Sequence, residues 1–452
     1  MALLPTLCAA QTAQEEGADI QGDVSGKVSW TLRECVDYAL TNNISLKRDI
    51  VAVRSAEEDV KQARAGLFPS LSFGTSHSVG YRPWTNSNIT SVTDGMVVNG
   101  ADKGYYNGSY SLSANWTLWN GNKNHNQLKM NKMLRDEAQL DSAVTANSIQ
   151  EQIAQYYVQA LYLKEAVTVA AHSVEVSRAN EQRGKVFVEV GSMSKADLAQ
   201  LTAQRSQDEY ALVEAQSELS LCLVRLKQVL ELPPNTGFDV SDVEATDSQA
   251  LELVPDLKDV YNNALEARPE IKRGLRAIER SQLQEKIARA SFMPTIGVSA
   301  GAGSGTNSMN ASGWSNQFKS NFDMQVGITA SVPIFDQRQA RTAVNKARLQ
   351  QVTAELELQD SKKSLYSTIE NYWEQAVTSQ QKFIAARENV SSREASFELL
   401  REQFDLGLKN VVELMTSKSN LLQAQQSMLQ SKYTAILNIQ MLRFYQRGQS
   451  NR

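Results

Sequence analysis

The chain has 452 residues, 42% of them apolar, with only 9 prolines, which is the composition of a folded protein rather than a disordered one. The formal net charge is −4 and no block of lysine and arginine stands out, so nucleic acid is not expected as the main partner. The three cysteines, Cys8, Cys35 and Cys222, give no disulfide framework and no metal-ligand spacing. The histidines are also few and dispersed, so we expect no metal and no cofactor.

The segment 1–29 is interpreted as the remnant of an export signal followed by a tail. Its short apolar run leads into Cys8-Ala9-Ala10, small residues suited to cleavage, although a basic segment before the run is missing. Cleavage near Ala10 and lipidation at Cys8 would both mean export. Further along, no apolar run reaches about 18 residues, so the sequence predicts no transmembrane helix.

An internal duplication organises the rest of the chain. Displacing the sequence by 225 positions aligns Leu32–Pro69 with Leu257–Pro294 without a gap, and 11 of 38 positions are identical. A displacement of 216 then aligns Trp119 with Phe335 and holds to about residue 204. The first half therefore carries 9 more residues between its proline and its aromatic, and an insertion tolerated there predicts a hairpin with a long loop.

Each half is predicted to contain the same elements in the same order. A short and a longer helix come first, at about 31–67 and 257–291. Two strands follow, at about 68–119 and 293–335, with loops rich in Asn, Ser, Gly and Thr at about 80–104 and 302–320. A very long helix comes next, at about 121–187 and 336–404, and a tight turn leads to a return helix, at about 195–230 and 411–445. The acidic, proline-containing stretch 231–256 is the predicted linker between the first repeat, 30–230, and the second, 257–445, and residues 446–452 form a tail.

Apolar residues recur along the long helices at alternating spacings of four and three. The first seam comprises Ile149, Ile153, Tyr156, Ala160, Leu163, Val167, Ala170 and Val174, and its repeat partners run from Leu365 to Val390. A period of 3.5 residues makes helices supercoil around one another, and about 65 residues make a helix about 100 Å long. We therefore predict an antiparallel coiled-coil hairpin in each half, with Cys222 buried in the seam of the first return helix.

The four predicted strands alternate between apolar and small polar residues. In the stretch YSLSANWTLW, for example, Tyr110, Leu112 and Trp116 fall on one face, while Ser111 and Ser113 fall on the other. We interpret the apolar face as facing outer-membrane lipid and the polar face as facing water, as in outer-membrane barrels. Four strands cannot close a barrel, so two, three or four copies would be required, giving 8, 12 or 16 strands.

Two other classes of function are less well supported. A periplasmic coiled-coil scaffold would pack its hairpins on soluble partners, but it has no use for four matched strands with aromatics near their ends. An enzyme is not indicated, because the sequence shows no Gly-rich phosphate loop, no metal cluster and no Ser/His/Asp or Cys/His constellation.

The sequence resembles the TolC-like outer membrane factor family, the exit ducts of bacterial efflux pumps and type I secretion systems. The resemblance covers about residues 30–445 and rests on the duplicated opening, on Phe68-Pro69 and Met293-Pro294 before the strands, and on the turns VGSMSKADL and LGLKNVVEL. It implies a mainly α fold with a membrane β-barrel part: a homotrimer whose 12-stranded barrel continues into a 12-helix periplasmic tunnel. It also implies passive conduction, with energy from an inner-membrane transporter joined through a periplasmic adaptor protein. The cargo stays open.

The two turns are the predicted functional end of the chain. Gly191 and Gly407 align at the 216 displacement, where each long helix stops, and glycine ends helices by adopting a left-handed conformation. The resemblance implies that the adaptor grips these tips, through the contact triplets Gly191-Ser192-Met193 and Gly407-Leu408-Lys409.

Asp197 and Glu413 each follow their glycine by six residues, and Ser194-x-x-Asp197 and Asn410-x-x-Glu413 have the pattern of capping boxes. The resemblance adds a gating role, in which Asp197 pairs with Lys409 to tie neighbouring hairpins shut. Three copies of Glu413 would line the constriction as an anionic ring.

The chain departs from the family pattern at two positions near this gate. Phe404 stands where the family often has tyrosine, and Thr416 stands where a second acidic ring is expected. Fewer polar contacts should therefore hold the closed state, and exposed ion pairs are worth only about 0–1 kcal/mol each.

Overall fold

The computed structural model describes residues 29–84, 90–93, 96–99, 103–241, 246–310 and 312–447. Cys8 and the rest of the predicted signal remnant up to residue 28 lie outside these ranges, as do residues 448–452 of the predicted tail.

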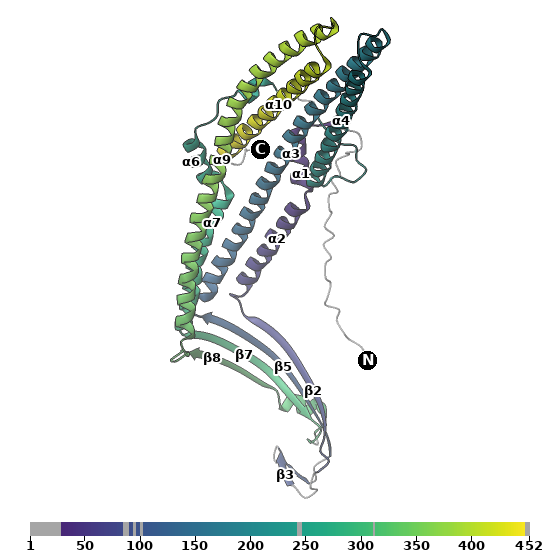
Figure 1. Ribbon diagram of the computed structural model, residues 1–452. Helices are drawn as coiled ribbons and strands as arrows, with labels where there is room; N and C mark the ends of the chain where they lie inside the picture. The colour runs from purple at the N-terminus through teal and green to yellow at the C-terminus, as the bar shows by residue number, and fades with distance from the viewer. Residues whose placement is uncertain are drawn as a thin grey trace. The chain divides into compact units, whose positions relative to one another are not determined.

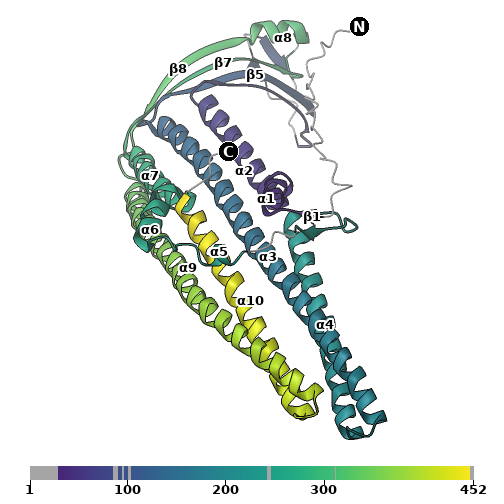
Figure 2. The same cartoon turned by 90° about the horizontal axis from the view of Figure 1, so that it is seen from above.

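The main helices form where the sequence predicts them. In the first half they are α1 (Leu32–Asn42), α2 (Ile44–Ala65), α3 (Lys123–Glu189) and α4 (Lys195–Leu230), and in the second α6 (Leu257–Ala267), α7 (Pro269–Arg289), α9 (Gln339–Asp405) and α10 (Val411–Arg447). The two long helices, α3 and α9, have 67 residues each. Each leads through a turn into its return helix, α4 or α10 (Figure 2). None of the helices within the described ranges is long and apolar enough to span a membrane.

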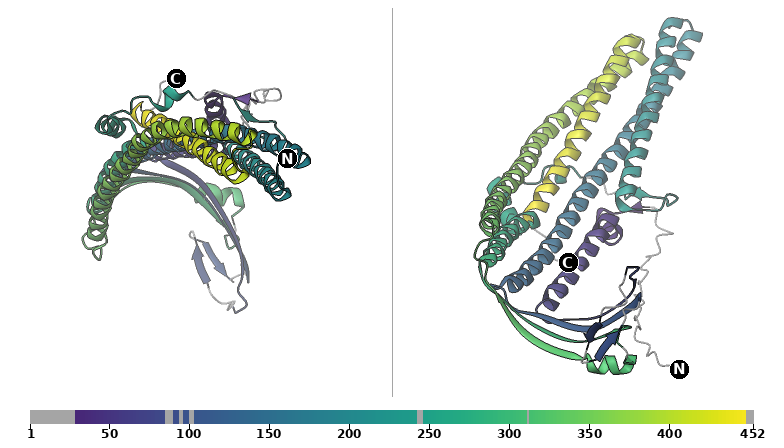
Figure 3. Two further views of the ribbon diagram at one scale, coloured as in Figure 1. Left: turned by 45° about the horizontal axis from the view of Figure 1, so that its top comes forward. Right: turned by 90° about the horizontal axis from the view of Figure 1, so that it is seen from below.

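The four predicted strands form one antiparallel sheet. They are β2 (Ser70–Tyr81), β5 (Gly104–Trp119), β7 (Thr295–Asn307) and β8 (Asp323–Ser331), paired in the order β2-β5-β7-β8 (Figure 1). The strands curve along their length (Figure 3). Among the strands that the structure describes, β2 and β8 each have one neighbour in this sheet, so each leaves one edge open.

The register of the sheet confirms the predicted two faces. Phe73 lies opposite Leu112, which lies opposite Ala302, which in turn lies opposite Met324, so one apolar row crosses all four strands. The adjacent row consists of Ser72, Ser113, Gly301 and Gln325. On the apolar face Phe73 is 69% exposed and Met324 is 72% exposed. The chain therefore presents a broad apolar surface, most of which the described residues leave uncovered.

Two predicted loops contain secondary structure that the sequence did not indicate. In the loop predicted at 80–104, β3 (Thr90–Thr93) pairs with β4 (Met96–Asn99). The loop predicted at 302–320 was wrong in two respects, because β7 continues to Asn307 and α8 (Trp314–Ser320) follows it. The buried Gln317 holds this turn through its side chain, which donates to the carbonyls of Asn310 and Ser312 and accepts from the amide of Asn307. One amide side chain leaves no periodic signal in the sequence.

The predicted linker contributes a short strand and a helical turn. β6 (Asp239–Val240) pairs in parallel with β1 (Ser29–Trp30), and α5 (Asp247–Ala250) follows. Lys164 of α3 reaches Asp239 at 2.9 Å and attaches this small sheet to the long helix.

The strand-to-helix corners preserve the duplication in their backbone. Gly121 and Asn122 have φ of +64° and +62°, and their counterparts at a displacement of 216, Gln337 and Arg338, have φ of +54° and +69°. Left-handed conformations are uncommon for residues other than glycine, so their recurrence at equivalent positions reflects a shared corner geometry. The first turn of each long helix is capped in the same way, since Asn120 accepts from the amide of Asn124 and Asp336 accepts from that of Ala340.

The described residues divide into two compact units, and each draws on both sequence repeats. The first unit takes its described residues from 1–41, 152–245 and 395–426, and therefore contains both hairpin turns. The second takes them from 42–151, 246–394 and 427–452, and contains the four-stranded sheet.

The predicted seams are the cores of these units. In the second unit Leu365, Ile369 and Ala376 pack with Val260, Ala264, Ile271, Leu358, Ile439, Leu442 and Tyr445. At the edge of this core the buried Arg268 guanidinium lies 3.7 Å from the centre of the Tyr445 ring and 3.5 Å from a Glu151 oxygen. In the first unit Cys222 is buried as predicted, and burial raises the pKa of its thiol, so it acts as a small apolar core residue.

A cavity in this seam should be costly. Replacing the fully buried Ile369 with alanine should lower the free energy of unfolding by about 2–5 kcal/mol, because the lost contacts leave a void in a close-packed core. Thermal unfolding followed by far-UV circular dichroism in detergent measures the change. Gln359→Ala, at an exposed position of the same helix, is the control and should leave the unfolding temperature almost unchanged; an equal effect of the two substitutions would contradict the assignment of the seam.

Candidate functional site: the two hairpin turns

Both hairpins end in the same backbone motif. Gly191 and Gly407 have φ of +78° and +73°, as predicted for glycines that end helices. The amide of Ser192 donates to the carbonyl of Phe187, and the amide of Leu408 donates to the carbonyl of Gln403. In each case the donor lies five residues after the acceptor, which is the hydrogen bond that defines a Schellman motif. These hydrogen bonds satisfy carbonyls that the last turn of each long helix would otherwise leave unpaired.

Both return helices begin with a capped first turn at the positions predicted for capping boxes, and the acidic side chains contact the capping side chains. The Ser194 hydroxyl accepts from the amide of Asp197 at 3.1 Å and donates to the Asp197 carboxylate at 2.8 Å. Asn410 accepts from the amide of Glu413 at 2.8 Å, and its side-chain nitrogen donates to the Glu413 carboxylate at 3.2 Å. Local capping therefore accounts for part of the role of both acidic residues.

The structure brings together two of the three predicted gating residues. Lys409 Nζ lies 2.6 Å from a Glu413 oxygen, one helical turn away, whereas Asp197 is engaged by Ser194. Within the chain Lys409 therefore has Glu413 as its partner, and the Asp197–Lys409 pair stays a prediction for contacts between neighbouring chains. Thr416 donates to the carbonyl of Val412 and contributes no charge.

Apolar side chains at the very ends of the turns extend the predicted contact triplets. Val190 is 71% exposed, Leu406 is 74% exposed, and the predicted contact residue Leu408 is 70% exposed. Val190 and Leu406 were not among the predicted contact residues, although they align at the 216 displacement and directly precede the two glycines. Met193, by contrast, is half-buried and packs inward, which makes it a weaker contact residue than the triplet suggests.

Behind the turns an apolar cluster joins the two hairpins. Leu201 of α4 packs with Phe397 and Phe404 of α9 and with Val411 and Leu414 of α10. The rings of Phe187 and Phe404 lie 6.2 Å apart, and Phe404 is only 3% exposed. Phe404 therefore contributes to packing between the two hairpins.

An ion-pair network ties α3 to α4 within the first hairpin. Arg205 contacts Glu209 at 2.6 Å and Glu181 at 2.7 Å, and Arg178 contacts Glu209 at 2.9 Å. Hydrogen bonds from Arg178 and Arg205 hold the pKa of the Glu209 carboxyl below its usual range. Within the described ranges no group of three or more histidine, cysteine, aspartate or glutamate residues could hold a metal ion.

Comparison with known proteins assigns this architecture to a family. The family described as outer membrane efflux protein matches residues 35–230 and 260–445, nearly the whole of both repeats. The chain belongs to this family. Protein CyaE of Bordetella pertussis is 22% identical over 421 residues, which cover 90% of this chain and 84% of CyaE. The outer membrane protein TolC of Escherichia coli is 21% identical over 440 residues, which cover 93% of this chain and 83% of TolC.

Solved structures show the same fold. The outer membrane protein VceC of Vibrio cholerae superposes with a TM-score of 0.76 at 17% identity, covering 92% of this chain and 96% of VceC. The CmeC outer membrane channel of Campylobacter jejuni gives 0.76 at 19% identity, covering 93% of this chain and 87% of CmeC. The chain is thus an outer-membrane protein of a non-enzymatic efflux channel family.

The cap at the second turn can be tested by itself. Replacing Asn410 with alanine removes the acceptor for the Glu413 amide and should cost about 1 kcal/mol of local stability, which corresponds to roughly five-fold faster amide exchange at residues 411–414. Hydrogen exchange read by mass spectrometry measures this directly. Asn410→Ser, which keeps a capping oxygen, should exchange at nearly the wild-type rate; equal acceleration in both variants would contradict the capping role.

Proposed function

We propose that the chain is the passive exit duct of a tripartite efflux or type I secretion system. It would conduct substrates from a periplasmic adaptor and an inner-membrane transporter to the exterior, and it would be gated at the hairpin turns. The observation that carries this proposal is the two-faced sheet with its uncovered apolar face and two open edges, in a chain that also contains two long helical hairpins.

Closure of the sheet requires further copies of the chain. Unpaired strand edges are not tolerated in hydrocarbon, because no water is present to satisfy their amides and carbonyls. The open edge of β2 in one copy can pair with the open edge of β8 in the next, so that every edge is used. Three copies would give the 12-stranded barrel and 12-helix tunnel that the family resemblance implies.

The position of α8 fits a lipid-facing surface. Tyr110, which shares the apolar face with Leu112, makes edge contacts with the rings of Trp314 and Phe318, and Ser304 donates to the carbonyl of Phe318. The short helix therefore lies over the apolar face, and Trp314 remains 55% exposed. Aromatic side chains of this kind are enriched at the interface between membrane and water, so α8 would lie outside the barrel at its rim.

The two turns present similar apolar side chains to a docking partner. Val190, Leu406 and Leu408 are apolar and exposed beside glycines that permit close approach of a partner's backbone. An adaptor with complementary apolar side chains would bury them, and removing that apolar surface from water would favour association.

The gate would carry charges of both signs. Three copies of Glu413 would form an anionic ring, but each carboxylate has Lys409 beside it at 2.6 Å, which offsets part of its charge. A scaffold without a channel is not favoured, because the uncovered apolar face and its two open edges would then need a protein partner in water. The cargo is set by the partners and not by these residues.

Single-channel recordings in planar bilayers test the gate. The purified wild type should give a small, cation-favouring conductance, Glu413→Gln should lose that preference, and Lys409→Gln should strengthen it, because each substitution removes one sign of charge from the same ring. Lys123→Gln is the control, because Lys123 begins α3 and is far along that helix from the hairpin turn at its other end. Unchanged selectivity in both variants would contradict the assignment of the gate while keeping the channel, and a wild type that conducts nothing would contradict the duct.

Fluorescence quenching tests the placement of α8. In liposomes containing brominated phosphatidylcholine, Trp314→Phe should remove part of the lipid-quenched tryptophan emission, because Trp314 would contact lipid. Trp373→Phe, in the protein core of the second unit, should not change that quenched fraction. If aqueous iodide quenches the emission of Trp314 and brominated lipid does not, α8 lies in the lumen instead.

A further inference from the structure

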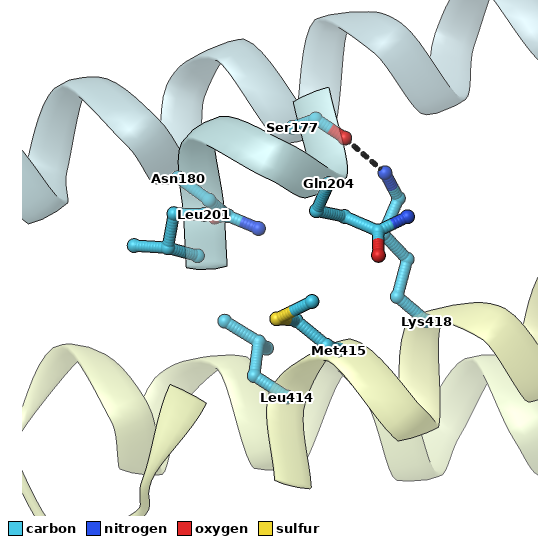
Figure 4. A pocket seen from close by; sticks show the side chains of 7 residues that line it. All are labelled: Ser177, Asn180, Leu201, Gln204, Leu414, Met415 and Lys418. Atoms are coloured by element: carbon cyan, nitrogen blue, oxygen red, sulfur yellow. Dashed lines mark hydrogen bonds between the residues drawn. The ribbon is translucent and has the colours of Figure 1, made fainter. Parts of the chain in front are cut away.

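A lysine of the second hairpin is inserted into the first. Lys418 of α10 is 7% exposed, and its ammonium group lies between α3 and α4, where it donates to the carbonyl of Ser173 at 2.8 Å and contacts Ser177 Oγ and an Asp208 carboxylate oxygen. Figure 4 shows Lys418 reaching from α10 to Ser177 across the junction. We call these four residues the Lys418 cage.

The cage matches the chemistry of an ammonium group. Lysine has three N–H donors, and the cage offers three acceptors, one of them charged. Gln204 of α4 donates to the other Asp208 oxygen at 2.9 Å, so the 5%-exposed carboxylate is also held in place. Burial lowers the pKa of Lys418, and hydrogen bonding to Asp208 opposes that shift, so the charged form depends on its partner.

The other contacts between the hairpins are less directional. Nη1 of Arg183 contacts both carboxylate oxygens of Asp405 at 2.7–2.8 Å, but both side chains are partly accessible to water, where ion pairs contribute little. The apolar cluster around Phe404 attracts without fixing one geometry, because hydrophobic association is non-directional. A small cavity adjoins the cage and is lined by Asn180, Leu414 and Met415 among others.

We propose that Lys418 is a positioning residue for the gate. Its ammonium group fixes the seating of α10 on the first hairpin, and Lys409 and Glu413 lie on the same hairpin within about three turns of helix. The cage would therefore hold the gating residues of each chain in the closed arrangement from behind the turns. This inference rests on the proposed gated duct.

Two variants separate positioning from simple stability. Lys418→Met leaves Asp208 buried without its countercharge, so it should lower the unfolding temperature and raise the basal conductance several-fold. Adding Asp208→Asn removes the second charge and keeps hydrogen bonds to Ser177 and Gln204. The double variant should recover most of the lost unfolding temperature but keep the raised conductance. Neutral contacts do not hold α10 in one position on the first hairpin as the ion pair does.

The matched control is Lys432→Met. Lys432 is another mostly buried lysine of α10, paired with Asp247 in the second unit, and its loss should lower the unfolding temperature without changing conductance. Conductance that returns to the wild-type level in the double variant, or that stays at that level in Lys418→Met, would overturn the inference. Absence of current from the wild type would instead overturn the proposed function and this inference with it.

Discussion

The physical constraint on which the structure depends is the satisfaction of backbone hydrogen bonds in lipid. The four strands of one chain expose a continuous apolar face, yet β2 and β8 each leave an edge unpaired within the described sheet. In water that face would favour aggregation, and in hydrocarbon those edges would cost several kcal/mol for each unsatisfied group, as an order-of-magnitude figure. Closure of a ring by copies of the chain, as proposed, would remove both costs, so the sheet itself favours assembly.

The helical hairpins meet a different demand. Each hairpin pairs a 67-residue helix with a shorter return helix, and apolar seams of Leu, Ile, Ala and Phe hold the helices together. Such seams stabilise the hairpin but do little to fix how far one helix slides or tilts against another. The most directional contact between the two hairpins of a chain in the first unit is the Lys418 cage. This distribution suits the proposed gate, which would need a hairpin that is stable along its length and has two arrangements at its end.

Much of the fold could be read from the sequence because it is written in strict periods. The 4-3 spacing gave α3 and α9 to within three residues at either end, and the strand alternation gave the two faces of the sheet. The capping boxes and glycines predicted the turns because these signals are local. What could not be predicted depends on contacts between distant residues: α8 depends on Gln317 and Tyr110, and Lys418 is an ordinary charged helix residue until α10 is placed against Ser173 and Asp208.

The most direct test of the central claim is the mass of the assembled protein. Native mass spectrometry of the detergent-solubilised protein measures it without any assumption about conduction or cargo. We expect a particle of three chains, each of 50.1 kDa before any processing, that requires detergent to stay in solution. A monomer that stays soluble in water without detergent would contradict it, because the apolar face and the open edges would then have found another solution within a single chain.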